Sequence, residues 1–152
     1  MYSREEALNY IFEKHPGAVF VTNTGYISRA VYSLYPSYKS IFYMQGSMGL
    51  SPAIGLGIAL NTDKDVVVLC GDASLLMHLG ITHTIRDAEL ENLFVYILDN
   101  EGHESVGGYK CSDLESDYCG ISSIIKISSD GKPPRVNLEC PEVTNNIKSF
   151  LL

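Results

Sequence analysis

Positive charge is scarce in this chain. Its 152 residues include 11 Lys and Arg against 18 Asp and Glu, a formal net charge of −7. Nucleic-acid affinity comes largely from cationic side chains on the phosphate backbone, so we expect no nucleic-acid partner. Only Lys64 and Arg86 are cationic between Lys39 and Lys110, so a phosphate held by this middle segment would depend on a metal ion and a helix dipole, with little help from Lys or Arg.

Long hydrophobic runs are absent as well. The longest apolar runs, such as 66–70 and 93–98, fall far below the roughly 18 residues of a membrane-spanning helix. Residues 1–6 are polar and acidic and contain no apolar signal core. We therefore expect a cytoplasmic protein with no membrane segment. Because 45% of the residues are apolar and the length leaves little room for a second core, we expect one domain over 1–152.

Cysteine and histidine occur without the spacings of metal or redox motifs. The four cysteines form no CxxC pair, and the four histidines form no HExxH pair. We therefore expect no zinc or iron–sulfur site, and reduced thiols with Cys70 packed inside a strand. A GxxxxGKS/T phosphate loop is absent too, and Gly55-Leu56-Gly57 lacks the third glycine of a dinucleotide motif.

The chain does contain a clear strand–helix–strand pattern. The apolar runs 66–70 and 93–98 are typical of strands covered on both faces, and 75–90 between them has helical periodicity. Short connections make this a right-handed βαβ unit with parallel strands. The sequence therefore predicts an α/β fold with three α/β/α layers and a mostly parallel sheet. The other expected elements are helices over 4–15, 28–35 and 52–60, and strands over 18–22, 41–44, 124–127 and 135–138.

Polar turns follow three of the expected strands at one edge of the sheet. In an open parallel sheet, ligands bind off the carboxyl ends of the strands, so the chemistry is expected at these turns. Nine of the 13 glycines fall between Gly46 and Gly108, which is typical of backbone that turns sharply or approaches a ligand. The three turns are 23–25, 71–74 and 99–102.

Asp72 and Asn100 are the candidate metal ligands at this edge. In a βαβ unit they would lie at the tips of parallel strands, where carboxylate and amide oxygens suit Mg²⁺ or Ca²⁺. A helix that begins near Ser74 would add backbone N–H groups, and a helix N-terminus beside Mg²⁺ is a diphosphate site. Spacing alone leaves open that Asp72 only caps a helix and that Asn100 only forms a turn.

Four segments, in order along the chain, resemble motifs of thiamine-diphosphate enzymes. Gly71-Asp72-Ala73-Ser74, with Asp99-Asn100 after the next strand, is similar to their GDG–NN signature, and 46–49 is similar to the turn that holds the aminopyrimidine. Residues 24–29 resemble the TGxxSR segment, and 103–108 the HxSTGG run, of the phosphonopyruvate and sulfopyruvate decarboxylases. The chain is thus similar to the diphosphate-binding (PP) domain of that family, which implies the thiamine-diphosphate-binding fold.

The resemblance implies a role for each matching residue. Asp72, the Asn100 side chain and the Gly102 carbonyl would ligate Mg²⁺. Met48 would wedge between the two rings of the cofactor, and the Gly46 carbonyl would accept a hydrogen bond from its amino group. Alternatively, Met48 fills the core, as methionine does in many proteins. The implied cofactor-binding residues are Thr24, Gly25, Gly46, Ser47, Met48, Gly71, Asp72, Ala73, Ser74, Asn100 and Gly102.

His103, just past the metal loop, is the candidate catalytic side chain besides Met48. An imidazole beside the reacting carbon could bind the substrate carboxylate or relay a proton. The alternative is a loop histidine that is hydrogen-bonded to backbone. Ser105 and Gly107 are weaker candidates for holding an anionic substrate, and Glu104 is expected to be a solvated loop charge.

Two features depart from the family pattern. Ala73 stands where the signature has glycine, and a positive φ there would cost about 1 kcal/mol or more. The part after Cys111 is short, with an abbreviated helix expected over 113–119 and a brief end past Glu142.

The resemblance also implies a missing half. These enzymes need a second domain that binds the pyrimidine, and 152 residues do not hold one. The implied protein is the PP-domain subunit of a 2-oxo acid decarboxylase, a carbon–carbon lyase that uses thiamine diphosphate and Mg²⁺. It would pair with a separate pyrimidine-binding subunit, as α₂β₂ or higher, and act on a small anionic 2-oxo acid. Alternatives are a non-catalytic cofactor-binding or regulatory subunit, a plain metal-dependent phosphate binder, and another thiamine reaction such as carboligation.

Overall fold

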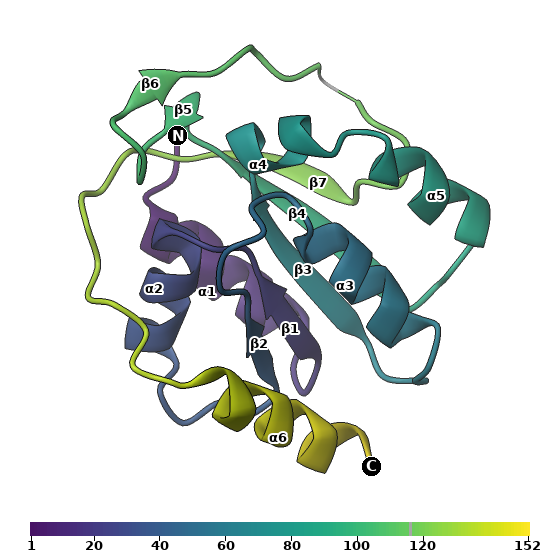
Figure 1. Ribbon diagram of the computed structural model, residues 1–152. Helices are drawn as coiled ribbons and strands as arrows, with labels where there is room; N and C mark the ends of the chain where they lie inside the picture. The colour runs from purple at the N-terminus through teal and green to yellow at the C-terminus, as the bar shows by residue number, and fades with distance from the viewer. Residues whose placement is uncertain (116) are drawn as a thin grey trace.

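The computed structural model describes residues 1–115 and 117–152, and a five-stranded parallel sheet forms its centre (Figure 1). The strand order is β2-β1-β3-β4-β7, and a two-stranded hairpin, β5-β6, lies beside one end of the sheet. The predicted α/β fold with a mostly parallel sheet is confirmed. The strands are β1 (Val19–Thr22), β2 (Ile41–Tyr43), β3 (Val66–Gly71), β4 (Leu93–Asp99), β5 (Gly102–His103), β6 (Tyr109–Lys110) and β7 (Ser123–Lys126).

The central strands form because their side chains are apolar on both faces. In β3, Val67 and Leu69 enter the hydrophobic cluster on one face, and Val66, Val68 and Cys70 enter the cluster on the other. All five are fully buried, as expected of a strand in the middle of a parallel sheet. The parallel pairing of β3 with β4 brings their carboxyl ends to the same edge.

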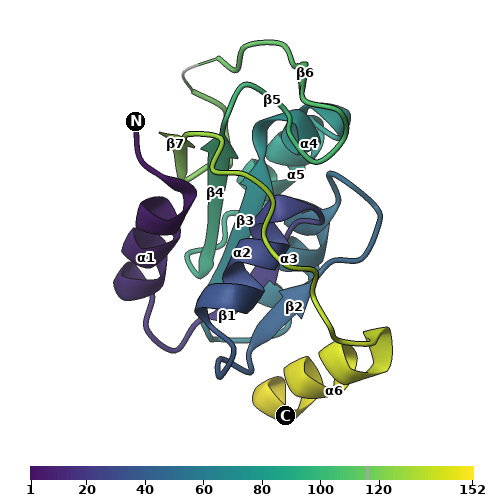
Figure 2. The same ribbon diagram turned by 90° about the vertical axis from the view of Figure 1, so that its left-hand side faces the viewer.

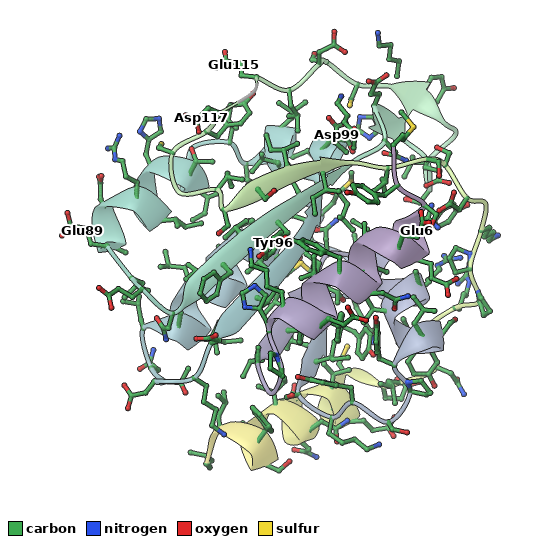
Figure 3. The ribbon with its side chains drawn as sticks, turned by 180° about the vertical axis from the view of Figure 1, so that it is seen from behind. Glu6, Glu89, Tyr96, Asp99, Glu115 and Asp117 are labelled. Atoms are coloured by element: carbon green, nitrogen blue, oxygen red, sulfur yellow. The ribbon has the colours of Figure 1, made fainter. Side chains whose placement is uncertain are left out.

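Helices cover both faces of the sheet and make the three predicted layers. α1 (Arg4–Lys14) and α2 (Tyr26–Leu34) pack on one face, and α3 (Ser51–Ala59), α4 (Asp72–Met77) and α5 (Ile81–Ala88) pack on the other (Figures 2 and 3). α6 (Cys140–Leu151) lies at the β2 edge. No helix in the described part of the chain is both long enough and apolar enough to cross a bilayer.

The helix expected over 75–90 is two helices. α4 begins earlier, at Asp72, and ends where His78 leaves helical geometry with φ −138° and ψ 43°. α5 begins only after Gly80, a residue type with low helix propensity. The break matters because it leaves α4 as a short element over the carboxyl end of β3.

The C-terminal third differs most from the prediction. No strand forms over 135–138; this segment runs along the sheet, and Val136 and Leu138 pack singly against the core, which produces the strand-like alternation. No helix forms over 113–115 or 117–119, and Ser116 lies outside the described residues. The end of the chain forms α6, which begins with a capping box between Glu139 and Glu142 and buries Val143 and Ile147.

Candidate functional site

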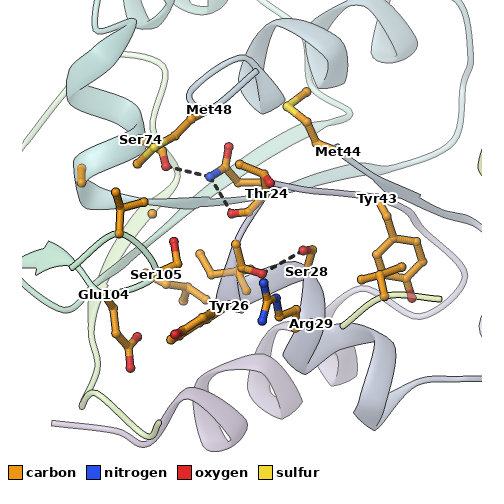
Figure 4. Close-up of a pocket in the computed structure, with 18 of the residues that line it drawn as sticks. Thr24, Tyr26, Ser28, Arg29, Tyr43, Met44, Met48, Ser74, Glu104 and Ser105 are labelled. Atoms are coloured by element: carbon orange, nitrogen blue, oxygen red, sulfur yellow. Dashed lines mark hydrogen bonds between the residues drawn. The ribbon is translucent and has the colours of Figure 1, made fainter. Parts of the chain in front are cut away.

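A cavity of about 670 Å³ opens at the carboxyl ends of β1, β3 and β4 (Figure 4). The strand order reverses between β1 and β3, since β2 follows β1 on one side and β3 lies on the other; a parallel sheet binds ligands at such a point. Gly107 does not line the cavity. The other predicted site residues do: Thr24, Gly25, Gly46, Ser47, Met48, Gly71, Asp72, Ala73, Ser74, Asn100, Gly102, His103 and Ser105.

Asp72 joins the tips of β3 and β4. Its Oδ2 accepts hydrogen bonds from the Gly102 N–H and from the Cys111 thiol, each at 2.9 Å. Burial raises the pKa of Asp72 above its ordinary value, and the nearby Asp99 charge adds to this, while the hydrogen bonds oppose it. The residue is therefore bound into the loop after β4, and it is not the N-cap of α4, which is Gly71.

The Asn100 amide is oriented by a buried ion pair. Asn100 Nδ2 donates to Glu104 Oε2 at 3.1 Å, and the same oxygen lies 2.5 Å from Arg4 Nη2. The Arg4 and Glu104 side chains are only 5% and 18% exposed, so Glu104 is not the solvated loop charge that was expected. With Nδ2 engaged, Asn100 Oδ1 has no hydrogen bond among the described residues.

Lys126 fixes the loop between β4 and β5. Its Nζ lies 2.7 Å from Asp99 Oδ2 and 3.0 Å from Glu101 Oε1. Glu101 adopts a left-handed φ of +61°, and its N–H donates to Asp99 Oδ1 at 3.0 Å. These contacts stabilise the sharp turn that carries Asn100.

Asn23 connects three of the loops around the cavity, a function that sequence reasoning missed. This buried side chain donates from Nδ2 to Ser74 Oγ at 2.7 Å, the dashed line at Ser74 in Figure 4. Its Oδ1 accepts from the Gly49 N–H at 3.2 Å. Because the Ser74 hydroxyl accepts from Asn23, its own hydrogen stays available for a ligand.

Two glycines permit the close packing of these loops. Gly25 has φ +97°, and a Cβ there would lie 3.0 Å from Ser105 Oγ. Gly49 has φ +92°, and a Cβ there would lie 2.5 Å from the Ser74 carbonyl oxygen. Any larger residue would be strained at either position and would push two walls of the cavity apart.

Ala73 causes no strain. It lies in α4, is buried, and is not among the residues with positive φ. The expectation that alanine would distort this loop is therefore not met, because a helical position accepts alanine best of all residues.

Met48 and His103 both line the cavity, Met48 from the loop after β2 and His103 from β5. Met48 is half-buried, so it is not a core residue. The His103 imidazole has no hydrogen bond among the described residues, whereas its backbone carbonyl accepts from the Val106 and Gly108 N–H groups. The imidazole is thus available to a ligand.

Three arginines line the same cavity: Arg4, Arg29 and Arg135. They come from α1, α2 and the segment before α6, all outside the cation-poor stretch between Lys39 and Lys110. The cavity as a whole therefore contains cations that the middle segment lacks, whereas the expectation for a phosphate held by that segment stays a prediction. Sequence reasoning missed these cations because folding brings both ends of the chain to this site.

The donors present fit a magnesium-bound diphosphate. No group of three or more His, Cys, Asp and Glu side chains among residues 1–115 and 117–152 could hold a metal ion. The available donors are the Asp72 carboxylate, the free Asn100 Oδ1 and the Gly102 carbonyl, all hard oxygens. Mg²⁺ is held by few protein oxygens and completes its shell with phosphate oxygens and water. The free Ser74 hydroxyl suits the phosphates of the same ligand.

Most of the chain matches known proteins. Residues 21–132 match the family model described as thiamine pyrophosphate enzyme, C-terminal TPP binding domain. The phosphonopyruvate decarboxylase of Streptomyces hygroscopicus is 44% identical over 111 residues, which cover 73% of this chain and 27% of that protein. Sulfopyruvate decarboxylase subunit beta of Methanothermobacter thermautotrophicus is 40% identical over 107 residues, 70% of this chain and 57% of that protein.

The overlap with these relatives is partial. The chain spans less than two thirds of the length of both proteins. It covers more of sulfopyruvate decarboxylase subunit beta of Methanococcus maripaludis, 69% of that protein, at 35% identity over 128 residues. An X-ray structure from Mycobacterium smegmatis, described as thiamin diphosphate-dependent, shares the fold with a TM-score of 0.61 and 20% identity, over 75% of this chain and 24% of that one.

Proposed function

The chain belongs to the thiamine pyrophosphate enzymes, whose C-terminal cofactor-binding domain it matches, and from this premise we propose that it is the diphosphate-binding subunit of a Mg²⁺-dependent 2-oxo acid decarboxylase. Thiamine pyrophosphate is the same cofactor as thiamine diphosphate. The observation that carries the proposal is the meeting of Asp72, Asn100 and Gly102 at the cavity, with oxygen donors left free for a metal. The names of the relatives, all decarboxylases among those compared, support the reaction type.

In this proposal the residues that follow β3 and β4 hold the cofactor by its diphosphate. Asp72, the Asn100 amide oxygen and the Gly102 carbonyl ligate Mg²⁺, and the Ser74 hydroxyl donates to a phosphate oxygen. Metal binding requires ionised Asp72, and the Gly102 N–H helps to keep it so by donating to the carboxylate. The cofactor, when bound, supplies the electron sink for loss of CO₂.

The remaining residues orient the reacting groups. Thr24 and Gly25 contact the diphosphate from the β1 side, and the Gly46 carbonyl and Ser47 hold the aminopyrimidine ring. Met48 packs between the rings and excludes water from them. The His103 imidazole would bind the substrate carboxylate while it is present and, after CO₂ has left, would donate a proton from a ring nitrogen to the substrate carbon that had carried it.

We also propose a separate partner subunit that binds the pyrimidine, in an α₂β₂ or higher assembly. Its support is that two of the relatives are named as beta subunits of sulfopyruvate decarboxylase, which implies another kind of subunit in those proteins. The substrate in this proposal is a small 2-oxo acid with an anionic tail, because the relatives are named for phosphonopyruvate and sulfopyruvate.

The test is to purify the chain alone and together with a candidate pyrimidine-binding subunit. CO₂ release from 2-oxo acids is then measured with thiamine diphosphate and Mg²⁺, and binding of the cofactor is followed by calorimetry. We expect turnover only in the mixture, and none with Asp72→Asn in place of the wild-type chain. Full activity of the chain alone would overturn the proposal that a separate partner subunit is needed. If the mixture shows neither turnover nor Mg²⁺-dependent cofactor binding, the proposed decarboxylase activity is overturned. The alternative of a non-catalytic subunit would then remain.

A further inference from the structure

Arg29, in the first turns of α2, carries a charge that nothing in the described structure neutralises. Its Nη1 is buried and has no hydrogen-bond partner. None of the ion pairs among residues 1–115 and 117–152 includes it. The guanidinium carbon lies 5.3 Å from the centre of the Tyr26 ring, a distance at which the ring attracts a cation.

Arg4 lies on the same ring and shows what a satisfied guanidinium looks like here. Its carbon is 5.8 Å from the Tyr26 ring centre. Arg4 is paired with Glu104 at 2.5 Å and also donates to the Gly131 carbonyl at 3.3 Å. A buried polar group without a partner is costly, so proteins rarely retain one unless a ligand uses it. Arg4 and Arg29 therefore differ although both lie against Tyr26: Arg4 is paired within the protein, whereas Arg29 Nη1 is left for a ligand.

The other charged groups of the cavity already have uses. Asp72 is bonded to Gly102 and Cys111, and Glu104 is paired with Arg4. Glu139 is exposed and caps α6. Arg135 is exposed to solvent. Arg29 is thus the cation of the cavity whose buried Nη1 is left for an anionic ligand.

The position of Arg29 separates it from Ser74. Figure 4 shows Ser74 and Met48 on one side of Thr24, and Arg29 and Tyr26 on the other. A ligand that contacts both Ser74 and Arg29 must therefore extend past Thr24.

We propose that Arg29 binds the oxyanion tail, phosphonate or sulfonate, of the substrate and so selects 2-oxo acids that carry such a tail. This inference rests on the proposed function. A guanidinium presents a planar fork of N–H donors that matches two oxygens of a phosphonate or sulfonate. The Tyr26 ring holds the fork in place, so less freedom is lost when the tail binds. Pyruvate lacks the tail and gains nothing from Arg29.

The first arm of the test measures binding without catalysis. The probes are 3-sulfopropionate and 3-phosphonopropionate, with propionate as the uncharged-tail control, added to the chain and its partner in the presence of thiamine diphosphate and Mg²⁺. Calorimetry should show both anionic probes bound at least about tenfold more weakly by Arg29→Gln than by wild type. Arg29→Lys should restore part of the affinity, because it keeps the charge but not the fork.

The matched control is Arg86→Gln, which removes an exposed arginine of α5 that is paired with Asp87 and does not line the cavity. It should leave probe binding unchanged. In the second arm, kcat/KM is compared for sulfopyruvate, phosphonopyruvate and pyruvate. Arg29→Gln should lower kcat/KM for sulfopyruvate and phosphonopyruvate at least about tenfold, mainly by raising KM, and should change kcat/KM for pyruvate less than about twofold.

Several results would overturn the inference. An equal loss for all three substrates would make Arg29 structural. Weaker binding of thiamine diphosphate would assign it to the cofactor, and loss of assembly with unchanged probe binding would assign it to the partner. Absence of probe binding by the wild-type complex would refute the subsite. If the probes bind through Arg29 but no 2-oxo acid releases CO₂, the proposed function fails and the anion subsite stands. If CO₂ is released but the preference for an anionic tail does not depend on Arg29, the proposed function stands and the anion subsite fails.

Discussion

Asn23 and Asn92 lie at opposite ends of the same sheet, and each ties several chain segments together with one amide. Asn23 follows β1 at the carboxyl end and bonds to the loop before α3 and to α4. Asn92 precedes β4 at the amino end, and its Nδ2 donates to three carbonyls, those of Ala59, Thr62 and Lys64. Both hold loops together, but what lies next to them differs.

The difference is in what each network leaves unused. At the amino end, the two hydrogens of the Asn92 amide serve three backbone carbonyls, so this amide has no donor left for a ligand. A hollow exists there too, lined by 59–63 and 90–92, but the amide donor in its wall is already engaged. At the carboxyl end, Asn23 bonds to Ser74 and leaves the Ser74 hydrogen free for a ligand. The donors of the Asn92 network are thus spent within the fold, whereas the Asn23 network ends in a free donor at the cavity.

The strongest test of this comparison removes the charge at the metal site. Asp72→Asn is nearly the same size as the native residue and deletes the anionic ligand that Mg²⁺ prefers. We expect Mg²⁺-dependent affinity for thiamine diphosphate, measured by calorimetry, to fall by at least about 100-fold, since even indirect partners of a metal ligand contribute about 10- to 100-fold. The melting temperature should stay near that of wild type, because the change also removes a buried carboxylate. Unchanged cofactor binding would contradict the assigned metal site.

Asn23→Ala should affect stability and binding together. The change deletes the bonds to Ser74 and Gly49 and leaves buried groups unpaired, so we expect about 2 kcal/mol less free energy of unfolding. Because the loops around the cavity separate, affinity for the cofactor should fall about tenfold as well. Urea unfolding and calorimetry on the same preparation test both effects. A variant that loses stability but binds normally would place Asn23 in the same class as Asn92.

Asn92→Ala should lower stability alone. Three carbonyls at the amino end lose their donor, and we expect about 1.5 kcal/mol less free energy of unfolding in urea. Cofactor affinity should remain within about twofold of wild type, because the cavity lies at the other end of the sheet. Asn61→Ala is the matched control: that exposed amide donates to a single carbonyl, Gly57, and should cost less. Weakened cofactor binding by Asn92→Ala would break the proposed division between the two ends.

Glu104→Gln tests whether the buried ion pair orients the metal ligand. Glutamine keeps the shape but weakens the contacts to Arg4 and Asn100, so the Asn100 amide is held less firmly. We expect Mg²⁺ affinity in the presence of cofactor to fall about tenfold. In a double-mutant cycle with Arg4→Met, the losses in Mg²⁺ affinity should not add, because both act through the same amide. Additive losses would show that Arg4 and Glu104 act separately.

This network marks the limit of what the sequence could predict. The apolar runs 66–70 and 93–98 settle β3 and β4, because strands buried on both faces leave a continuous local signal. From those strands follows the meeting of Asp72 and Asn100 at one edge. Arg4 and Glu104 are 100 residues apart, and no local pattern links them.

The C-terminal third shows the same limit for the fold. α6 contains Thr144 and the pair Asn145-Asn146, residue types with weak helix propensity, and it is stabilised by burial of Val143 and Ile147 against the rest of the molecule. Such support depends on tertiary contacts, and the local signal of the helix is confined to the capping box between Glu139 and Glu142 and the spacing of Val143 and Ile147. Arg29 was part of a recognised segment, but only the structure shows that its Nη1 is buried without a hydrogen-bond partner.

The smallest expected effect is a pH dependence of stability that arises from His15, which precedes β1 at the amino end of the sheet. His15 is buried, and its Nε2 lies 2.8 Å from the Tyr96 hydroxyl (Tyr96 is labelled in Figure 3). Burial lowers the pKa of His15 below its ordinary value of 6.5, although Asp65, at 3.9 Å, opposes this. The unfolded chain therefore binds a proton below pH 6.5 that the folded chain does not, so the stabilisation is complete above pH 6.5 and is lost as the pH falls toward the folded pKa.

Urea unfolding between pH 7.5 and 5 measures this loss as a difference between variants. Relative to His15→Gln, the wild-type chain should lose about 1 kcal/mol over this range, since one proton contributes at most about 1.4 kcal/mol per pH unit. His83→Gln, which changes an exposed histidine of α5, serves as the control and should follow wild type. Cofactor affinity at pH 7.5 should be the same in all three proteins, because His15 does not line the cavity. If the wild-type chain and His15→Gln lose stability in parallel as the pH falls, the proton is taken up by another group. His15 then contributes nothing to the pH dependence of the free energy of unfolding.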